Sequence, residues 1–174
     1  MHPRVTGWAS AAAAMALVAG VAGIVGIGGG GCTAKAKHPD HAVLPAWAQD
    51  EFHRLELDER LELHQKVEPG FQLGDFDGDG QLDVAAQVQD RRSGKVGVLL
   101  LHRAGGGHVL GAGQPLGDGG DDWNWLAGWK VVAGEQVPGG AANGKNALFV
   151  EKRGSPGGVI YWNGSDYVWV PWSG

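Results

Sequence analysis

An aspartate-rich loop at residues 75–83 sets the strongest limit on how this chain can fold. It reads Asp-Phe-Asp-Gly-Asp-Gly-Gln-Leu-Asp. Calcium in proteins takes roughly six to eight oxygen ligands, often from alternate positions of one short loop. The expected ligands are the carboxylates of Asp75, Asp77, Asp79 and Asp83 and the backbone carbonyl of Gln81. Gly80 permits the sharp turn that such a loop needs. The spacing predicts a calcium site, with a solvated Asp/Gly turn as the alternative.

The loop differs from an EF-hand, which has a bidentate glutamate at position 12 and a helix on each side. Position 12 is Ala86, and residues 83–89 favour a strand. Residues 74–85 resemble instead the short calcium loop of FG-GAP/VCBS repeats, found in integrin-like propellers. Because the sequence holds one such loop, a full propeller is not expected.

A wider resemblance covers most of residues 44–172. The order of the calcium loop, a Gly-Lys hairpin, the stretches 110–113 and 120–123, and a closing strand with Tyr161 and Trp162 is similar to a family of small bacterial envelope proteins described as FG-GAP/VCBS-like. The resemblance implies a β fold and a location in the cell envelope or periplasm. It implies no activity, since none is assigned to that family.

The N-terminal residues 1–31 are predicted to be a signal peptide. Arg4 precedes an apolar, uncharged run over residues 8–27, and a glycine run then leads to Cys32, the only cysteine. This order is typical of a lipoprotein signal, with Cys32 as the lipidated N-terminus of a membrane-anchored protein facing the periplasm or exterior. An ordinary secretory signal or an uncleaved N-terminal anchor is the alternative, because the run is long enough to span a bilayer.

Residues 32–44 are predicted to be a linker, and residues 45–174 a FG-GAP/VCBS-like β domain. His38 and His41 lie in the linker, where a polar tether is favoured over a metal site. The predicted fold is a single compact domain, mainly β, of antiparallel strands with a short N-terminal helix over 46–56. The glycine-rich residues 104–122 are expected to form a loop. The expected strands cover 61–67, 83–89, 96–103, 129–133, 146–152, 157–162 and 166–171, with a second helical segment as the alternative over 61–67.

Charge and motifs exclude several classes of function. The net charge of −5 and the lack of a basic patch argue against nucleic-acid binding. Residues 139–145 have the G-x-x-x-x-G-K spacing of a phosphate-binding loop, but Asn146 follows where Ser or Thr should be, and a strand is expected where a helix should begin. The sequence therefore predicts no nucleotide site, and it holds no recognisable catalytic constellation.

Two functions remain from the sequence. The first is a calcium-binding envelope protein that serves as a binding or structural module, with an envelope protein or a glycan as partner. The alternative is a carbohydrate-active exported protein, glycan-binding or hydrolytic, since paired carboxylates beside aromatic rings suit glycoside chemistry. The residues of that possible ligand surface are Trp123, Trp125, Asp121 and Asp122, although core packing is the commoner use of such rings.

Overall fold

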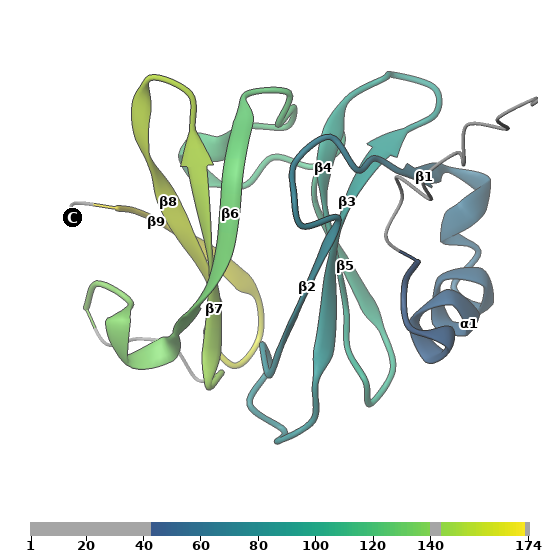
Figure 1. Cartoon of the computed structure of the whole chain (residues 1–174), viewed down its shortest axis with the longest axis horizontal. Coiled ribbons are helices and arrows are strands. Elements are labelled where there is room, and N and C mark those ends of the chain that lie inside the picture. Colours follow the sequence, from purple (N-terminus) through teal and green to yellow (C-terminus); the bar gives the residue numbers. More distant parts are fainter. Residues whose placement is uncertain (1–42, 140–143, 173–174) are drawn as a thin grey trace, which may run out of the picture. The chain divides into compact units, whose positions relative to one another are not determined.

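The computed structural model describes residues 43–139 and 144–172, which form two antiparallel β-sheets and one α-helix (Figure 1). The first sheet contains β1 (Leu61–Leu63), β2 (Phe71–Gly74), β3 (Asp83–Asp90), β4 (Val96–Leu101) and β5 (Gly107–Gly111). The second contains β6 (Leu126–Ala133), β7 (Asn146–Lys152), β8 (Ser155–Trp162) and β9 (Tyr167–Pro171). The helix is α1 (Ala46–Arg54), and short 3₁₀ turns occur at η1 (Leu57–Glu59), η2 (Gly117–Gly119) and η3 (Gly134–Gln136). The prediction of a single, mainly β domain with a short N-terminal helix is confirmed.

Strand β3 organises the first sheet. It pairs with β1 and β2 along one side and with β4 along the other, and β5 pairs with β4. Side chains alternate between the faces of a strand. Val84 and Ala86 therefore pack toward α1, whereas Ala85 packs toward the second sheet. The register pairs Val84 with Leu101.

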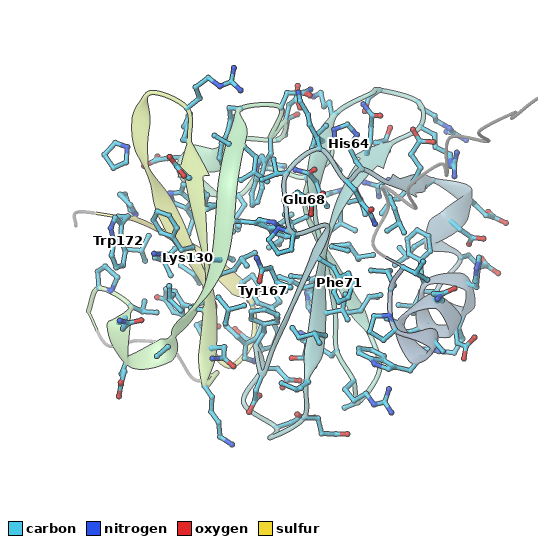
Figure 2. All side chains as sticks on the ribbon, viewed as in Figure 1. His64, Glu68, Phe71, Lys130, Tyr167 and Trp172 are labelled. Carbon is cyan, nitrogen blue, oxygen red and sulfur yellow. The ribbon has the colours of Figure 1, made fainter. Side chains whose placement is uncertain are left out.

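The main core lies between the two sheets. Figure 2 shows Tyr167 in this interior and Trp172 on the outer side of the second sheet. Burial of apolar surface between facing sheets is the main favourable term for such a fold. The buried residues of this core are Phe76, Ala85, Val98, Leu100, Leu110, Trp123, Leu126, Trp129, Leu148, Val150, Ile160 and Tyr167.

Helix α1 covers the outer face of the first sheet. Pro45 stands at its N-cap, and Ala48 and Phe52 form the buried stripe that packs on the sheet. The chain leaves the helical conformation at Glu56, whose φ is +54°. No helix among the described residues is long and apolar enough to cross a membrane.

Two local expectations need correction. The strand expected over 61–67 ends at Leu63, and a separate strand, β2, enters the aspartate loop. The glycine-rich stretch 104–122 is not all loop, because residues 107–111 form β5. Strands β4 and β5 approach each other closely at Gly97 of β4. A Cβ on Gly97 would lie 2.3 Å from the Leu110 carbonyl oxygen.

The other expected strands are present, with shifts of a few residues at some ends. Strand β7 begins at Asn146, so a strand follows the residues that imitate a phosphate-binding loop, as predicted. The predicted signal peptide and lipidated Cys32, together with most of the predicted linker, lie outside the described residues.

Candidate metal centre

The aspartate loop connects β2 to β3 and is bound to the second sheet at its base. The Asp75 backbone N–H donates to Asn146 Oδ1 (2.9 Å), and the Asn146 N–H donates to the Asp75 carbonyl (3.0 Å). Asn146 is the first residue of β7. The next residue of the loop, Phe76, is 1% exposed and packs in the main core. The loop therefore joins the two sheets at this end of the domain.

Hydrogen bonds within the loop curl the backbone around its carboxylates. Asp75 accepts the N–H of Gly78 on Oδ1 (2.8 Å) and the N–H of Gly80 on Oδ2 (3.0 Å). Asp77 accepts the Asp79 N–H (3.0 Å). The two glycines have φ of +88° and +90°, a region that residues with a Cβ rarely adopt. The sequence thus places glycine where the loop must turn back on itself.

The first three aspartates of the loop are placed to share a cation. Asp75, Asp77 and Asp79 each offer a carboxylate oxygen, and these atoms lie within 4.8 Å of one another. Two ligands of one calcium ion, each roughly 2.3–2.6 Å from it, are at most about 5 Å apart. The oxygen-only donor set and its spacing therefore fit a calcium ion. Lys145 is the cationic neighbour, with Nζ 3.6 Å from Asp75 Oδ2, and its side chain is 72% exposed.

Asp83 lies in a different group from the one the loop spacing predicts. Its carboxylate groups with Asp77 and His102, whereas Asp75 and Asp79 belong to the other cluster. Asp83 is fully buried, and it accepts the N–H of Phe76 on Oδ2 (2.9 Å) and that of Arg103 on Oδ1 (2.8 Å). Burial is the main cause that raises the pKa of Asp83. The carbonyl of Gln81 remains a predicted ligand.

His102 is the site residue that the sequence reasoning missed. It follows β4 directly, on the face of the sheet that meets the second sheet. Its Nδ1 lies 3.5 Å from Asp77 Oδ2, and its Nε2 shares a hydrogen bond of 2.7 Å with the Tyr167 hydroxyl. His108 and Trp162 pack against the same imidazole, with ring centroids 5.1 and 5.6 Å away. The information that was missing is the register of the hairpin with its turn at 90–95: Val84 pairs with Leu101, so the residue after Leu101 comes close to Asp83.

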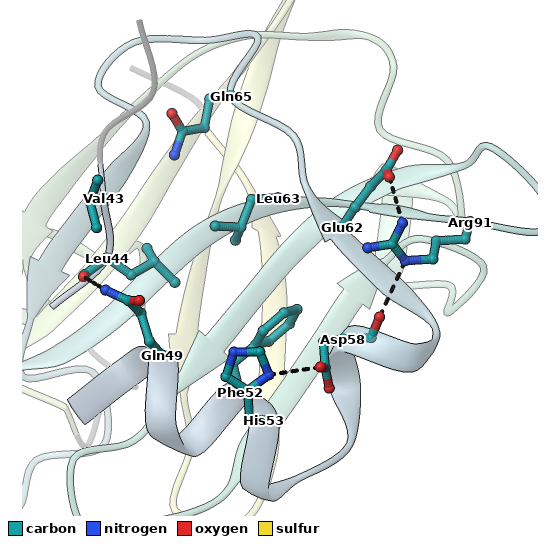
Figure 3. A pocket seen from close by; sticks show the side chains of 10 residues that line it. All are labelled: Val43, Leu44, Gln49, Phe52, His53, Asp58, Glu62, Leu63, Gln65 and Arg91. Carbon is teal, nitrogen blue, oxygen red and sulfur yellow. Dashed lines mark hydrogen bonds and ion pairs between the residues drawn. The ribbon is translucent and has the colours of Figure 1, made fainter. Parts of the chain in front are cut away.

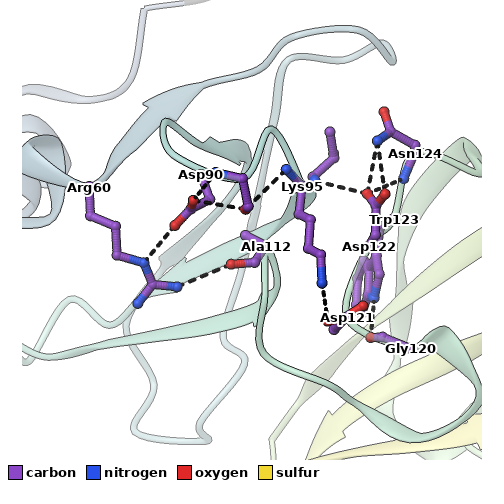
Figure 4. A network of polar contacts seen from close by, with 11 residues as sticks. Arg60, Asp90, Lys95, Ala112, Gly120, Asp121, Asp122, Trp123 and Asn124 are labelled. Carbon is purple, nitrogen blue, oxygen red and sulfur yellow. Dashed lines mark hydrogen bonds and ion pairs between the residues drawn. The ribbon is translucent and has the colours of Figure 1, made fainter.

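The predicted ligand surface does not form as expected. Trp123 has no exposed surface and packs in the core. The prediction that its ring forms part of a ligand surface is therefore wrong. Trp125 is half-buried, and its Nε1 donates to the Gly119 carbonyl (3.0 Å). Asp121 pairs with Lys95, and Asp122 accepts the Val96 N–H (3.0 Å). Asp121, Asp122 and Trp123 belong to a hydrogen-bonded turn over residues 120–124 (Figure 4).

The same network includes Asp90, at the far end of β3 from the loop. The Ser93 backbone N–H and hydroxyl both donate to Oδ1 at 2.8 Å, and Arg60 Nε donates to Oδ2 at 3.0 Å (Figure 4). These bonds, the Ser93 N–H first among them, hold the pKa of Asp90 well below its usual range. Both oxygens of this carboxylate therefore accept hydrogen bonds from groups of the protein itself.

A pocket of about 580 Å³ lies between α1 and β1 (Figure 3). Its charged side chains are paired with one another: His53 with Asp58 (2.7 Å) and Arg91 with Glu62 (2.9 Å). The other residues that line it are Val43, Leu44, Gln49, Phe52, Leu63 and Gln65. The pocket offers a chiefly apolar floor and holds none of the metal-ligating clusters.

Comparison with protein-family models, with curated proteins and with solved structures gave no significant match.

Proposed function

We propose that this protein is a calcium-stabilised binding or structural module of the bacterial cell envelope. The observation that carries the proposal is the convergence of the Asp75, Asp77 and Asp79 carboxylates within 4.8 Å of one another. The loop that holds them is bonded to Asn146 of the second sheet. A cation bound there would act on the contact between the two sheets.

The physical reason for a stabilising role is electrostatic. Carboxylates held this close repel one another, which opposes folding unless a positive charge lies between them. An ion that binds only the folded loop adds its binding free energy to the stability of the fold. A dissociation constant of roughly 10⁻⁴–10⁻³ M is typical of extracellular calcium modules. Such a value would suit an exported protein.

The envelope location rests on the first 32 residues. The apolar run followed by a glycine run and Cys32 supports export and a lipid anchor, with an envelope protein or a glycan as partner. Mass spectrometry of the membrane fraction should find a diacylated peptide that begins at Cys32. An unmodified Cys32 in a soluble secreted form would remove the lipoprotein part of the proposal.

Calorimetry of calcium binding to the full chain tests the metal site directly. We expect binding at millimolar calcium or below, and we expect Asp79→Ala to abolish it, because this change removes one ligand from an exposed position. Asp118→Ala is the matched control, since Asp118 is an exposed aspartate in a glycine-rich turn outside the clusters. If the wild-type chain binds no calcium at millimolar concentration, the proposal is wrong and the loop is only a turn.

The carbohydrate-active alternative gains no comparable support. Trp123 is buried, and Asp121 and Asp122 are engaged in contacts with Lys95 and Val96. In a screen of glycans, cleavage would support the hydrolytic alternative, whereas binding alone fits the proposed module as well.

A further inference from the structure

A second cluster of metal-ligating side chains lies beside the calcium loop, inside the sandwich. Asp77, Asp83 and His102 each offer one ligand atom, and these atoms lie within 4.8 Å of one another. Asp83 has no exposed surface and His102 is 7% exposed, whereas Asp79 of the loop cluster is exposed. We propose that these three residues bind a first-row divalent transition-metal ion, such as zinc, next to the calcium position.

The ligand chemistry separates this site from the calcium site. Calcium takes oxygen ligands, whereas an imidazole nitrogen suits zinc, copper, nickel and iron. Two carboxylates and one histidine leave a fourth position open on a tetrahedral ion. The nitrogen of His102 therefore selects a different class of metal from the one that Asp75 and Asp79 favour.

The distance between His102 and Asp77 supports an ion between them. Nδ1 and Oδ2 are 3.5 Å apart. A charge-assisted N–H···O bond is shorter, about 2.7–2.9 Å. Two ligands that each lie roughly 2.0–2.1 Å from zinc at the tetrahedral angle are about 3.4 Å apart. The observed separation fits two ligands of one small ion better than a direct hydrogen bond.

Outer contacts hold the ligands in place, as in known metal sites, where a histidine ligand bonds a second group through its other nitrogen. Here His102 Nε2 meets the hydroxyl of Tyr167, which is 7% exposed. The Phe76 and Arg103 N–H groups fix the Asp83 carboxylate. These contacts orient the ligand atoms before any ion arrives.

The charge balance points the same way. Within residues 43–139 and 144–172, Asp77 forms its ion pair with His102. In the same residues, no lysine or arginine lies within ion-pair distance of Asp83. A buried carboxylate next to a second, partly buried one needs a nearby positive charge. A divalent ion held by His102 would supply it to both.

The inference builds on the proposed function, because Asp77 belongs to both positions. Its Oδ1 accepts the Asp79 N–H inside the loop, and its Oδ2 faces His102. A bridging carboxylate lets the two ions bind side by side. The other ligands are not shared, so the two sites can be removed separately.

Visible absorption of cobalt, used as a probe for zinc, provides the test. The protein is the full chain carrying His38→Gln and His41→Gln, which removes two linker histidines as a background site. We expect cobalt to give d–d bands typical of a four- or five-coordinate ion and zinc to displace it. His102→Gln should abolish the bands and leave calcium binding unchanged. The matched control is His108→Gln, which removes the neighbouring imidazole and should keep the bands.

Three results would overturn the proposal: no cobalt bands in the starting chain, bands unchanged in His102→Gln, or bands lost in His108→Gln instead. Should His102→Gln fail to fold, Tyr167→Phe keeps the imidazole and removes only its hydroxyl partner. That change should weaken cobalt binding roughly 10–100-fold, and unchanged affinity would contradict the proposal. Asp79→Ala should lose calcium and keep cobalt, so failure of the calcium site and failure of this site remain distinguishable.

Discussion

Asp83 and Asp90 stand at the two ends of β3, and both are buried carboxylates. Asp90 receives hydrogen bonds from Ser93 and Arg60, and its pKa is lowered. Asp83 receives two backbone N–H bonds but faces the carboxylate of Asp77, and its pKa is raised, mainly by burial. The opposite pKa shifts on one strand have different main causes: hydrogen bonds from Ser93, followed by one from Arg60, lower the pKa of Asp90, whereas burial raises the pKa of Asp83.

The aspartates at the Asp90 end of β3 have a structural role, whereas those at the Asp83 end are placed to bind a metal ion. At the Asp90 end, Arg60 and Lys95 neutralise the carboxylates, and the turn is complete without any other partner. At the Asp83 end, carboxylates of the loop and of β3 gather with Lys145 on one side and His102 on the other. We expect changes at the first end to act regardless of metal, and changes at the second end to act through metal.

The largest effect is expected from Trp123→Ala, at the metal-independent end. The Trp123 N–H donates to the Val96 carbonyl at the start of β4 (2.8 Å), and its ring is fully buried. Removing so large a buried ring should cost about 3–5 kcal/mol of unfolding free energy, measured by chemical denaturation. The loss should be equal with calcium and with EDTA. Trp125→Ala, at a half-buried ring, is the control and should cost less. Equal small losses for both would mean that Trp123 is not a core residue.

The next effect is calcium stabilisation of the opposite end. At a calcium concentration 100 times the dissociation constant, the wild-type chain should gain about 2.7 kcal/mol of unfolding free energy. Asp79→Ala should gain nothing and should lose little in EDTA, because it also removes a repelling charge. Magnesium should substitute poorly, since it requires a smaller octahedral shell and keeps its waters. Equal stabilisation of wild type and Asp79→Ala would place the calcium elsewhere.

A smaller effect, of pH, is expected at the metal-independent end. The pKa of Asp90 is lower in the folded state than the usual 3.8, so the ionised form stabilises the fold. This contribution is fully present above pH 3.8 and is lost as the pH falls through the lower folded-state pKa. Asp90→Asn should therefore show a shallower loss of stability between about pH 4 and pH 2 than wild type. The measurement is thermal unfolding over this range in protein from which metal was removed by dialysis at neutral pH. A parallel pH dependence for both proteins would contradict the role given to Asp90.

Strands and helix could be predicted because their signals are local. Two short apolar segments on either side of the polar turn at 90–95 locate β3 and β4, and the spacing of Trp47, Ala48 and Phe52 locates α1. Strand β5 could not be found in this way, because glycine has a low strand propensity. Glycine is required in this strand because of tertiary packing. Gly97 and Gly111 pair across the sheet, and side chains at these positions would collide with the neighbouring backbone.

The loop ligands could be predicted for the same local reason, whereas His102 required a register. Asp75, Asp77 and Asp79 lie within five consecutive positions, so spacing alone brings them together. His102 is distant in sequence and meets Asp83 only through the pairing of β3 with β4. The burial of Trp123 could not be read locally, because it depends on packing against Trp125 and Trp169.

The smallest effect concerns Lys145, whose ammonium group lies beside the calcium loop. Its Nζ is 3.6 Å from Asp75 Oδ2, where it competes with a cation for the same carboxylate. An exposed ion pair of this kind contributes about 0–1 kcal/mol, so Lys145→Gln should change stability in EDTA very little. The same change removes a competing positive charge and should raise calcium affinity roughly 2–5-fold by calorimetry at low salt. The gain should shrink as salt is added, because salt screens exposed charges. Lys66→Gln, at another exposed lysine, is the control and should leave affinity unchanged. If Lys145→Gln lowers calcium affinity, the lysine supports the loop instead of competing for it, and the contrast between the two ends of β3 weakens.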